Sequence, residues 1–381
     1  MTLPLDGITV IALEQAVAAP FASRQLADLG ARVIKIERGT GDFARGYDDK
    51  VNGLASYFVW LNRGKESVVL DLKDPADFAL LTAMVREADV LIQNLVPGAV
   101  DRLGLSAEAA LELNPKLIFA SISGYGAGGA YEDKKAYDLL IQCESGLLSV
   151  TGMPDNPAKV GISIADIAAG MYAYSGILAA LINRGRTGRG DILEISMLEA
   201  MGEWMSQPLY YAMYGGQAPE RSGPQHASIA PYGPFPVSDG TVFLAVQNER
   251  EWAHFCSDLL GQPALATDPR FSSNTERVAN RPLLHEIIEA ALGGSSVVEV
   301  LTKLDEAQIA NAQLRTMLEL ADHPQLHQRG RWREIGSPVG DISVLLPPVS
   351  GRELEVTLGT IPELGAHTDA VKAEFQARRR Q

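Results

Sequence analysis

The chain has 381 residues, of which 46% are hydrophobic and 21% are charged. This composition is typical of a folded soluble protein, and the length is sufficient for two domains. The formal net charge is −14 at pH 7. That balance argues against nucleic-acid binding, which requires a basic face. Any anionic ligand must therefore be held by a local cluster of Lys and Arg.

Several further classes of protein are disfavoured by sequence pattern. No stretch reaches the roughly 18 uninterrupted apolar residues of a membrane span, so we expect no membrane segment. The opening MTLPLDGITVIALE has no basic n-region, which predicts a cytoplasmic protein without a signal peptide. Cys143 and Cys256 fit no zinc spacing, and their apolar helical context predicts free, buried thiols in a reducing compartment. His323 and His327 lack a third ligand of clear spacing, so no metal site is expected.

The first third of the chain alternates between strands and helices. Predicted strands cover 8–13, 32–37, 67–72, 90–94 and 117–122, and predicted helices cover 21–29, 75–87 and 107–113. This spacing is typical of parallel strands joined by crossover helices. We therefore expect an α/β fold with a Rossmann-like large domain. No Gly-x-Gly-x-x-Gly follows the first strand, so a dinucleotide site is not indicated.

The rest of the chain contains a long buried helix, a loop-rich segment and a smaller α+β region. Helices are predicted over 137–150, 167–182, 198–214, 249–260, 283–292, 297–306 and 369–380. Strands are predicted over 191–197, 241–247, 329–335, 342–346 and 355–358. The segment Gly215–Gly240 is dense in Gly, Pro and Ser, and it is interpreted as a domain boundary.

Basic residues recur near the ends of predicted strands. They are Arg38, Lys73, Arg102 and the pair Lys134 and Lys135. Because ligands of open α/β sheets bind at the carboxyl ends of strands, these charges predict a site for a phosphate-rich ligand. Each residue taken alone is equally well explained as a solvated surface side chain. Their recurrence in an acidic protein favours phosphate binding.

Asp166 is the candidate catalytic residue. It lies just before the uncharged run 167–183, and the residues after it, Ile-Ala-Ala-Gly, have little side-chain bulk. One interpretation is a helix N-cap, because Asp is a preferred residue there. The other is a nucleophile, which the helix dipole keeps ionised and which neighbouring backbone N–H groups assist as oxyanion donors. Position alone leaves both interpretations open.

Several motifs then resemble one known family, the class III coenzyme A-transferases, which include formyl-CoA transferase and have the α-methylacyl-CoA racemases as relatives. The matching segments are PLDGITVIALEQAVAAP, LADLGARVIKIER, LDLKDP, NLVPGAVDRLGL, LNPKLIFASISGYG, GISIADIAAGMYAYSGILAAL and LGAHTD. The resemblance covers nearly the whole chain. It implies a large Rossmann-like domain from 1–215 and 326–381, a small α+β domain over 225–325, and an obligate homodimer of interlocked rings.

The resemblance also implies roles for particular residues. Asp166 falls on the catalytic aspartate. The coenzyme A-binding positions are Arg38, Leu70, Asp71, Leu72, Lys73, Asn94, Leu95, Val96, Arg102, Lys135, Ala136, Tyr137 and Asp138. No cofactor is bound permanently, and coenzyme A and acyl-CoA act as substrates.

Two departures from the family narrow the expected activity. Tyr137 stands where the racemases carry a histidine base, and tyrosine, with an ordinary pKa near 10, is a poor base at neutral pH. The segment RSGPQHASIAPYG stands where formyl-CoA transferase carries a glycine-rich loop, so a formyl-CoA and oxalate pair is not indicated. A racemase or isomerase and a non-catalytic acyl-CoA-binding protein remain the alternative functions.

The expected reaction moves coenzyme A from a donor such as succinyl-CoA to a short acid such as itaconate or mesaconate. The resemblance implies a route through an aspartyl–acyl anhydride and an aspartyl-CoA thioester on Asp166. The candidate residues for the acid are Arg221, Gln225, His226 and Tyr232, which lie in the loop-rich segment. An Arg or His there would neutralise a second carboxylate, although the segment is equally well explained as a linker.

Overall fold

The structure is a computed structural model, and it describes residues 3–378. The chain forms two compact units, each described by itself. The first comprises 1–147, 160–207 and 330–381, and the second comprises 148–159 and 208–329. Residues 148–159 were expected in the large domain. They join the second unit because Gly223 N donates to the carbonyl of Gly152 at 2.9 Å and Arg221 Nε to that of Met153 at 2.9 Å.

The first unit is built on a six-stranded sheet. Its strands are β1 (Thr9–Leu13), β2 (Arg32–Glu37), β3 (Lys65–Val69), β4 (Val90–Gln93), β5 (Ile118–Ser123) and β8 (Asp191–Ser196). They pair in the order β3-β2-β1-β4-β5-β8, and every pairing is parallel. The predicted α/β fold with a parallel sheet is confirmed. The strand order reverses between β1 and β4, which is where doubly wound folds bind ligands.

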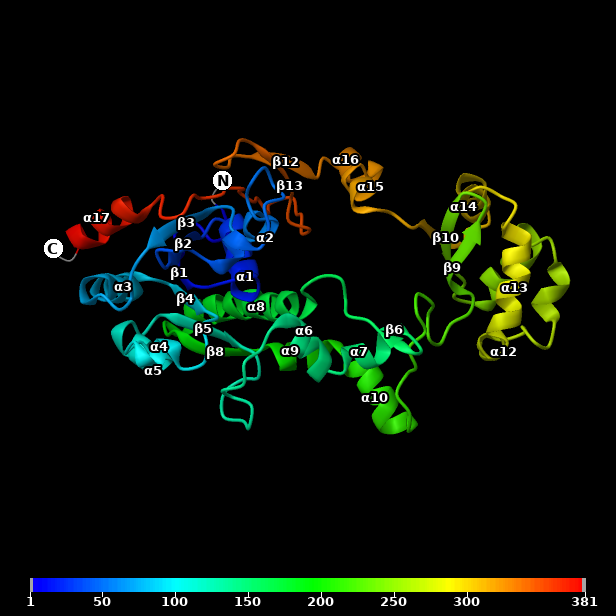
Figure 1. Cartoon of the computed structure of the whole chain (residues 1–381), viewed down its shortest axis with the longest axis horizontal. Helices are drawn as coiled ribbons and strands as arrows, with labels where there is room; N and C mark the ends of the chain where they lie inside the picture. Colours follow the sequence, from blue (N-terminus) through cyan, green and yellow to red (C-terminus); the bar gives the residue numbers. More distant parts are fainter. Residues whose placement is uncertain (1–2, 379–381) are drawn as a thin grey trace. The chain divides into compact units, whose positions relative to one another are not determined.

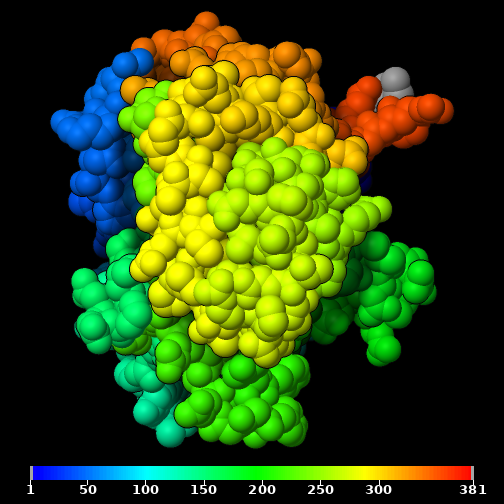
Figure 2. All heavy atoms as spheres, turned by 90° about the vertical axis from the view of Figure 1, so that its right-hand side faces the viewer, coloured from blue at the N-terminus to red at the C-terminus, as the bar shows by residue number. Residues whose placement is uncertain are grey.

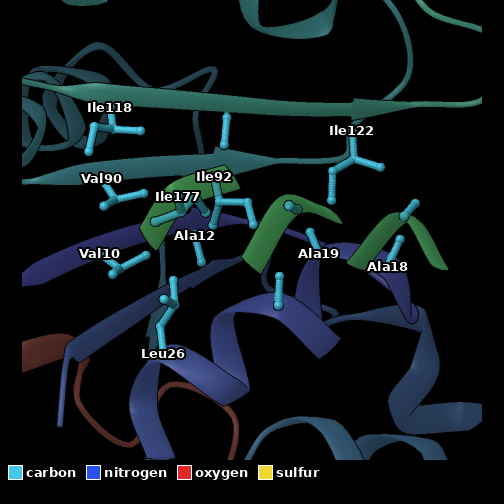
Figure 3. Close-up of a cluster of buried hydrophobic side chains, with 14 of the residues drawn as sticks. Val10, Ala12, Ala18, Ala19, Leu26, Val90, Ile92, Ile118, Ile122 and Ile177 are labelled. Atoms are coloured by element: carbon cyan, nitrogen blue, oxygen red, sulfur yellow. The ribbon is translucent and has the colours of Figure 1, made fainter. Parts of the chain in front are cut away.

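Helices cover both faces of this sheet. The principal ones are α1 (Ala18–Asp28), α3 (Pro75–Glu87), α5 (Ala107–Leu113), α8 (Ile164–Thr187), α9 (Met197–Trp204) and α17 (Thr368–Arg378). On β1, Val10 and Ala12 pack with α1 and α8, whereas Ile11 and Leu13 join the cluster of α3 and α17. Side chains of a strand point alternately to the two faces of the sheet. Because helices cover both faces, these strands are apolar at nearly every position. Figure 1 shows α8 beside α1, and Figure 3 shows Leu26 and Ile177 meeting the side chains of the sheet.

The helix α8 is longer than the predicted 167–182. By length and composition alone it would be long enough and apolar enough to cross a membrane, a test that core helices of soluble proteins also pass. Its buried residues are mostly alanine, together with Gly170. A Cβ atom at Gly170 would lie 2.6 Å from the carbonyl oxygen of Ala18, so α8 lies against the first turn of α1 at this point.

The remaining elements of the first unit are short. They are a 3-10 helix (Phe43–Gly46), α2 (Ser56–Leu61), α4 (Ala99–Arg102), α6 (Asp138–Glu144), β12 (Trp332–Ile335) and β13 (Ile342–Leu345). α7 (Leu147–Val150) and α10 (Ser206–Gly215) lie where the chain passes between the units. The C-terminal helix α17 is anchored to β2 and α3, because Glu374 pairs with Arg32 at 2.8 Å and Lys372 pairs with Asp77 at 2.7 Å.

The second unit contains a small antiparallel sheet and a group of helices. The sheet consists of β9 (Tyr232–Val237), β10 (Gly240–Ala245) and β11 (Ala310–Gln313), in the order β11-β10-β9, and β6 (Gly152–Met153) pairs separately with β7 (Asn156–Pro157). The helices are α11 (Glu249–His254), a π-helix (Phe255–Leu259), a 3-10 helix (Pro263–Thr267), α12 (Asn274–Ala279), α13 (Arg281–Leu292), α14 (Val297–Glu306), α15 (Met317–Ala321) and α16 (Pro324–Gln328). They enclose a core that includes Phe235, Trp252 and Phe271. Figure 2 shows residues near 250–300 of this unit, in yellow, packed as one body.

Some predictions were wrong. Cys256 is buried as expected, but Cys143 is exposed. Residues 355–358 form no strand, and the predicted helix 198–214 is broken at Met205. The loop-rich segment contains β9, which tolerates Pro234 and Pro236 because an edge strand can lack backbone N–H groups on its open side. The last two residues of the predicted helix 369–380 lie outside the described residues.

Candidate active site

Asp166 is not the N-cap of its helix. α8 begins at Ile164, its N-cap is Ser163, and Asp166 is therefore the third residue of the first turn. The helix starts earlier than predicted because a side chain from α6 reaches its amino end. Asp138 Oδ1 accepts hydrogen bonds from the backbone N–H of Ala165 at 2.8 Å and from that of Asp166 at 3.4 Å.

The amides beside Asp166 are consequently occupied. Besides the two bonds to Asp138, the N–H of Ile164 donates to the carbonyl of Ile162 at 2.8 Å and that of Ile167 to Ser163 at 3.0 Å. The expectation that these backbone groups are free oxyanion donors is therefore wrong for this structure. Asp138 takes the place of the capping side chain that Ser163 does not supply.

The electrostatic surroundings of Asp166 oppose its ionisation. Burial raises the pKa of Asp166 to about 7, and the negative charge of Asp138 adds to the shift. The dipole of α8 favours the carboxylate form, but burial and the like charge outweigh that contribution. Both effects favour the protonated form of Asp166 relative to an exposed aspartate.

Aromatic residues border the amino end of α8. Tyr57 Oη lies 3.3 Å from Ser163 Oγ, and its ring meets that of Tyr47 edge to face at 5.5 Å between centroids. The pKa of Tyr47 is raised to about 12 by burial and by the negative charges of Asp42 and Asp166. These tyrosines were not singled out from the sequence. The aromatic density of FARGYDDKVNGLASYFVW, residues 43–60, was the available signal.

A second helix begins close to this point. Gly170 lies one turn after Asp166 on the same side of α8 and contacts the carbonyl oxygen of Ala18. The N-cap position of α1 is Val17, which provides no capping side chain. Within residues 3–378 no side-chain hydrogen bond caps the first turn of α1, in which Ala18 and Ala19 carry backbone N–H groups and Pro20 has none.

A pocket of about 270 Å³ lies at the carboxyl ends of β1, β2 and β3. It is lined by Leu13, Glu14, Gln15, Ile36, Glu37, Arg38, Gly41, Asp42, Leu70, Asp71, Leu72, Lys73, Leu95 and Leu103. The structure thus brings together Arg38, residues 70–73 and Leu95 of the predicted coenzyme A positions. Asn94 has a structural role, because its side chain forms two hydrogen bonds with the backbone of Gln15. Its Nδ2 donates to the carbonyl of Gln15 at 2.8 Å, and its Oδ1 accepts the N–H of Gln15 at 2.8 Å.

The other predicted coenzyme A positions do not line this pocket. Val96 is exposed, and Arg102 on α4 donates to the carbonyl of Pro97 at 3.3 Å. Lys135, Ala136 and Tyr137 precede α6, where the Tyr137 side chain is 68% exposed. Asp138 contacts α8 through Oδ1, as described above.

Ion pairs are buried beneath the pocket. The Glu14 carboxylate lies 2.6 Å from Lys65 Nζ and 3.3 Å from Lys35 Nζ, and Lys35 also lies 2.8 Å from Asp42. Burial lowers the pKa of Lys65, whereas the neighbouring carboxylates raise that of Lys35. Because Lys35 of β2 pairs both with Glu14, directly after β1, and with Asp42, in the loop after β2, these pairs fix the two loops against each other.

The predicted acid-binding residues lie in the second unit. His226 stacks on Tyr232 with ring centroids 5.0 Å apart, and Gln225 Oε1 accepts a hydrogen bond from Arg281 at 3.2 Å. Arg281 also donates to the carbonyl of His226 at 2.8 Å and was not identified from the sequence. Arg221 donates instead to the carbonyls of Met153 and Pro154, so its guanidinium holds the β6–β7 hairpin.

Comparison with known proteins connects this site to a family. Residues 5–368 match the profile of CoA-transferase family III. The acetyl-CoA:oxalate CoA-transferase of Acetobacter aceti is 37% identical, over 98% of this chain and 96% of the relative. The succinate–glutarate CoA-transferase of Agrobacterium fabrum is 35% identical over the same shares. A crystal structure of a CAIB/BAIF family protein from Brucella suis has a TM-score of 0.88 at 34% identity, covering 98% of this chain and 100% of that one.

The first unit thus combines a parallel α/β sheet, a pocket at the carboxyl ends of its strands, and a partly buried ionisable carboxyl group on the first turn of α8. The chain belongs to CoA-transferase family III, which confirms the resemblance seen in its motifs. It is accordingly a CoA-transferase, whose substrates are CoA thioesters.

Proposed function

We propose that this enzyme transfers coenzyme A between an acyl-CoA and a short dicarboxylic acid, with Asp166 as the covalent nucleophile. The observation that carries the proposal is the environment of Asp166. It is a partly buried carboxyl group on the first turn of a helix whose next residues are Ile, Ala, Ala and Gly. Asp166 is only partly buried, so its carboxyl group is accessible to a thioester, whereas the small residues after it are packed against α1.

Asp166 acts in four balanced steps. Its carboxylate oxygen attacks the thioester carbonyl, the C–S bond breaks, and an aspartyl–acyl anhydride and a coenzyme A thiolate form. The thiolate attacks the aspartyl carbonyl and releases the donor acid, leaving an aspartyl-CoA thioester. The acceptor carboxylate attacks that thioester, its C–S bond breaks, and a second anhydride and the thiolate form. The thiolate then attacks the acceptor carbonyl of this anhydride, which gives acceptor-CoA and regenerates the Asp166 carboxylate. No net proton transfer is needed, so no separate base is required.

The oxyanions of these steps need donors other than the amides of Ala165 and Asp166, which Asp138 occupies. The first turn of α1 supplies them in our proposal. It has no side-chain cap and lies against α8 at Gly170. Removal of one such donor typically costs about 3–4 kcal/mol of transition-state stabilisation.

The pocket at the strand ends holds the nucleotide end of coenzyme A in this proposal. Arg38 and Lys73 line it, and both side chains are exposed at its rim. Their charges pair with phosphate oxygens, because charge-assisted hydrogen bonds are the stronger kind.

The acid substrates are proposed as short dicarboxylates. Two relatives are named for oxalate and for the pair succinate and glutarate. We therefore expect a succinyl-CoA-like donor and retain itaconate and mesaconate as acceptors to be tested. We add oxalate to the acceptors to be tested, because a relative of this chain is named an acetyl-CoA:oxalate CoA-transferase and not a formyl-CoA transferase. We further propose a cytoplasmic homodimer.

The first prediction tests the nucleophile. Asp166→Asn keeps the size of the side chain and leaves the capping contact from Asp138 in place, so the melting temperature should change little. Turnover should fall by at least about 10⁴-fold, because the attacking oxygen is lost. The measurement is transfer from succinyl-CoA to oxalate, glutarate, mesaconate and itaconate, followed by mass spectrometry.

The wild-type enzyme provides the matched chemical control. Incubation with acyl-CoA and then hydroxylamine should leave a modified Asp166 in the peptide map, and the Asn variant should show none. Retention of most of the transfer rate by the Asn variant, with deamidation excluded, would contradict the covalent route. Deuterium incorporation at the substrate α-carbon without transfer would instead identify a racemase or isomerase.

A further inference from the structure

Asp138 connects three segments of the first unit around Asp166. It is the first residue of α6, and its Oδ1 accepts the N–H groups of Ala165 and Asp166 at 2.8 and 3.4 Å. Its Oδ2 accepts from Gln142 Nε2 at 2.7 Å. Gln142 is fully buried, and its Oε1 in turn accepts the N–H of Val160 at 3.0 Å.

We propose that Asp138 is a positioning residue for the nucleophile: it caps α8 from outside that helix and places a fixed negative charge beside Asp166. The inference rests on the proposed function of Asp166. The resemblance to the family implied that Asp138 binds coenzyme A. We assign it a different role, because both oxygens of its carboxyl group accept hydrogen bonds from groups of the protein.

The capping contact sets the orientation of Asp166. The N-cap residue Ser163 provides no capping side-chain bond, and its hydroxyl lies 3.3 Å from Tyr57 Oη instead. The first turn of α8 is therefore held by Asp138 of α6, which lies 27 residues before Ala165 in the chain. Gln142 of the same helix also binds the backbone of Val160, in the segment that leads into α8. A displacement of about 1 Å at a reacting group can reduce the rate about 10²-fold, so this contact bears directly on turnover.

The charge of Asp138 affects which form of Asp166 predominates. The titratable groups that face Asp166 are Asp138 from α6 and Tyr47 from the segment before α2, with Tyr57 and Tyr137 beside them. None of these is a cation. A like charge favours the protonated acid, which cannot attack a thioester. Activity should therefore rise with pH as Asp166 ionises, around pH 7 in the wild type.

The second prediction compares two single variants of Asp138. Asp138→Asn retains an oxygen that can accept the two amides but removes the charge, so the acidic limb of kcat/KM should move to lower pH by about one unit. Asp138→Ala loses the cap as well, and its kcat should fall by about 10–100-fold below that of the Asn variant. The profiles are measured from about pH 5 to pH 9, so that the expected limb of the Asn variant lies within the range, and each acid is tested at saturation because its own ionisation changes at the low end.

A double variant controls for the lost hydrogen bond. Asp138→Asn places an NH₂ group opposite the NH₂ of Gln142, and adding Gln142→Glu restores an acceptor for both this group and the N–H of Val160. The double variant should regain the wild-type melting temperature. Its pH limb should lie between those of the wild type and the single variant, because the negative charge returns at a greater distance from Asp166.

The outcomes separate this inference from the proposed function. An unchanged acidic limb in Asp138→Asn, with KM for the acyl-CoA raised about tenfold, would make Asp138 a substrate ligand and overturn the positioning role. That result would leave the nucleophile intact, provided Asp166→Asn remains inactive. An unchanged limb with unchanged KM would overturn the inference as well. If Asp138→Ala does not fold, the Asn and double variants still give the pH comparison.

Discussion

At the scale of single residues, the basic side chains around the pocket fall into two groups. Lys35 and Lys65 are buried in ion pairs with Glu14 and Asp42. Arg38 donates only to the carbonyl of Gly41, at 3.1 Å, and within residues 3–378 neither it nor Lys73 has a carboxylate within ion-pair distance. Buried pairs are already neutralised, so the exposed charges are the ones available to a phosphate.

The third prediction concerns Arg38. Arg38→Ala should raise the Kd for coenzyme A by about 10–100-fold, the equivalent of roughly 1–3 kcal/mol for a charge-assisted hydrogen bond. Titration calorimetry with coenzyme A measures the effect. Arg189→Ala is the matched control, because Arg189 is an exposed arginine that does not line the pocket. Equal affinities for the two variants would exclude Arg38 as a phosphate ligand.

At the scale of elements, the contact between α1 and α8 determines where Asp166 lies. Ala18, Ala19 and Ala22 of α1 pack with the small residues of α8 in one buried cluster. Small side chains let two helices approach closely, and the carbonyl of Ala18 occupies the space that a side chain at Gly170 would need. Asp166 is one turn away on the same helix, so the position of the carboxylate follows from this packing.

The fourth prediction follows from that close approach. Gly170→Ala should destabilise the fold by about 1–3 kcal/mol and lower kcat, because α8 must move away from α1. Gly185→Ala on the same helix is the control, since a Cβ there meets nothing within 4 Å. Replacement of glycine by alanine inside a helix is otherwise favourable by about 1 kcal/mol. The melting temperatures should therefore change in opposite directions, and a Gly170→Ala enzyme as stable as the control would disprove the tight contact.

At the scale of the whole molecule, large apolar side chains remain uncovered in the single chain. α10 has no buried residue, and it exposes Leu209, Tyr210 and Tyr214, the last at 81%. On α8, Ile182 is 62% exposed. Apolar surfaces of this kind mark protein interfaces, and a second copy of the chain is the partner in our proposal of a homodimer.

The fifth prediction is a dimer that persists on dilution. Light scattering should give about twice the chain mass of 40.9 kDa at every concentration tested, because subunits that interlock can separate only by unfolding. Thermal unfolding should depend on protein concentration for the same reason. A mass of one chain under native conditions would refute the proposal.

Local sequence patterns determined most of the elements. The predicted bounds of α3, α5 and α14 agree with the structure residue for residue. The N-cap residues of these helices are Asp74, Ser106 and Ser296, whose side chains cap the first turn, so their start signals are contained within a few residues. The continuous apolar runs also predicted the buried parallel strands, because both faces of the sheet are covered.

The environment of Asp166 was decided by tertiary structure alone. The sequence identified the residue through its small neighbours and through family motifs, but the side chain that caps its helix is Asp138, from a different helix. The strand β9 was likewise hidden in a segment rich in Gly and Pro, because only pairing with β10 makes it a strand. Contacts of this kind join residues far apart in the chain, so no local pattern records them. The pKa of Asp166 depends on burial and on a neighbouring charge, and both exist only once the chain has folded.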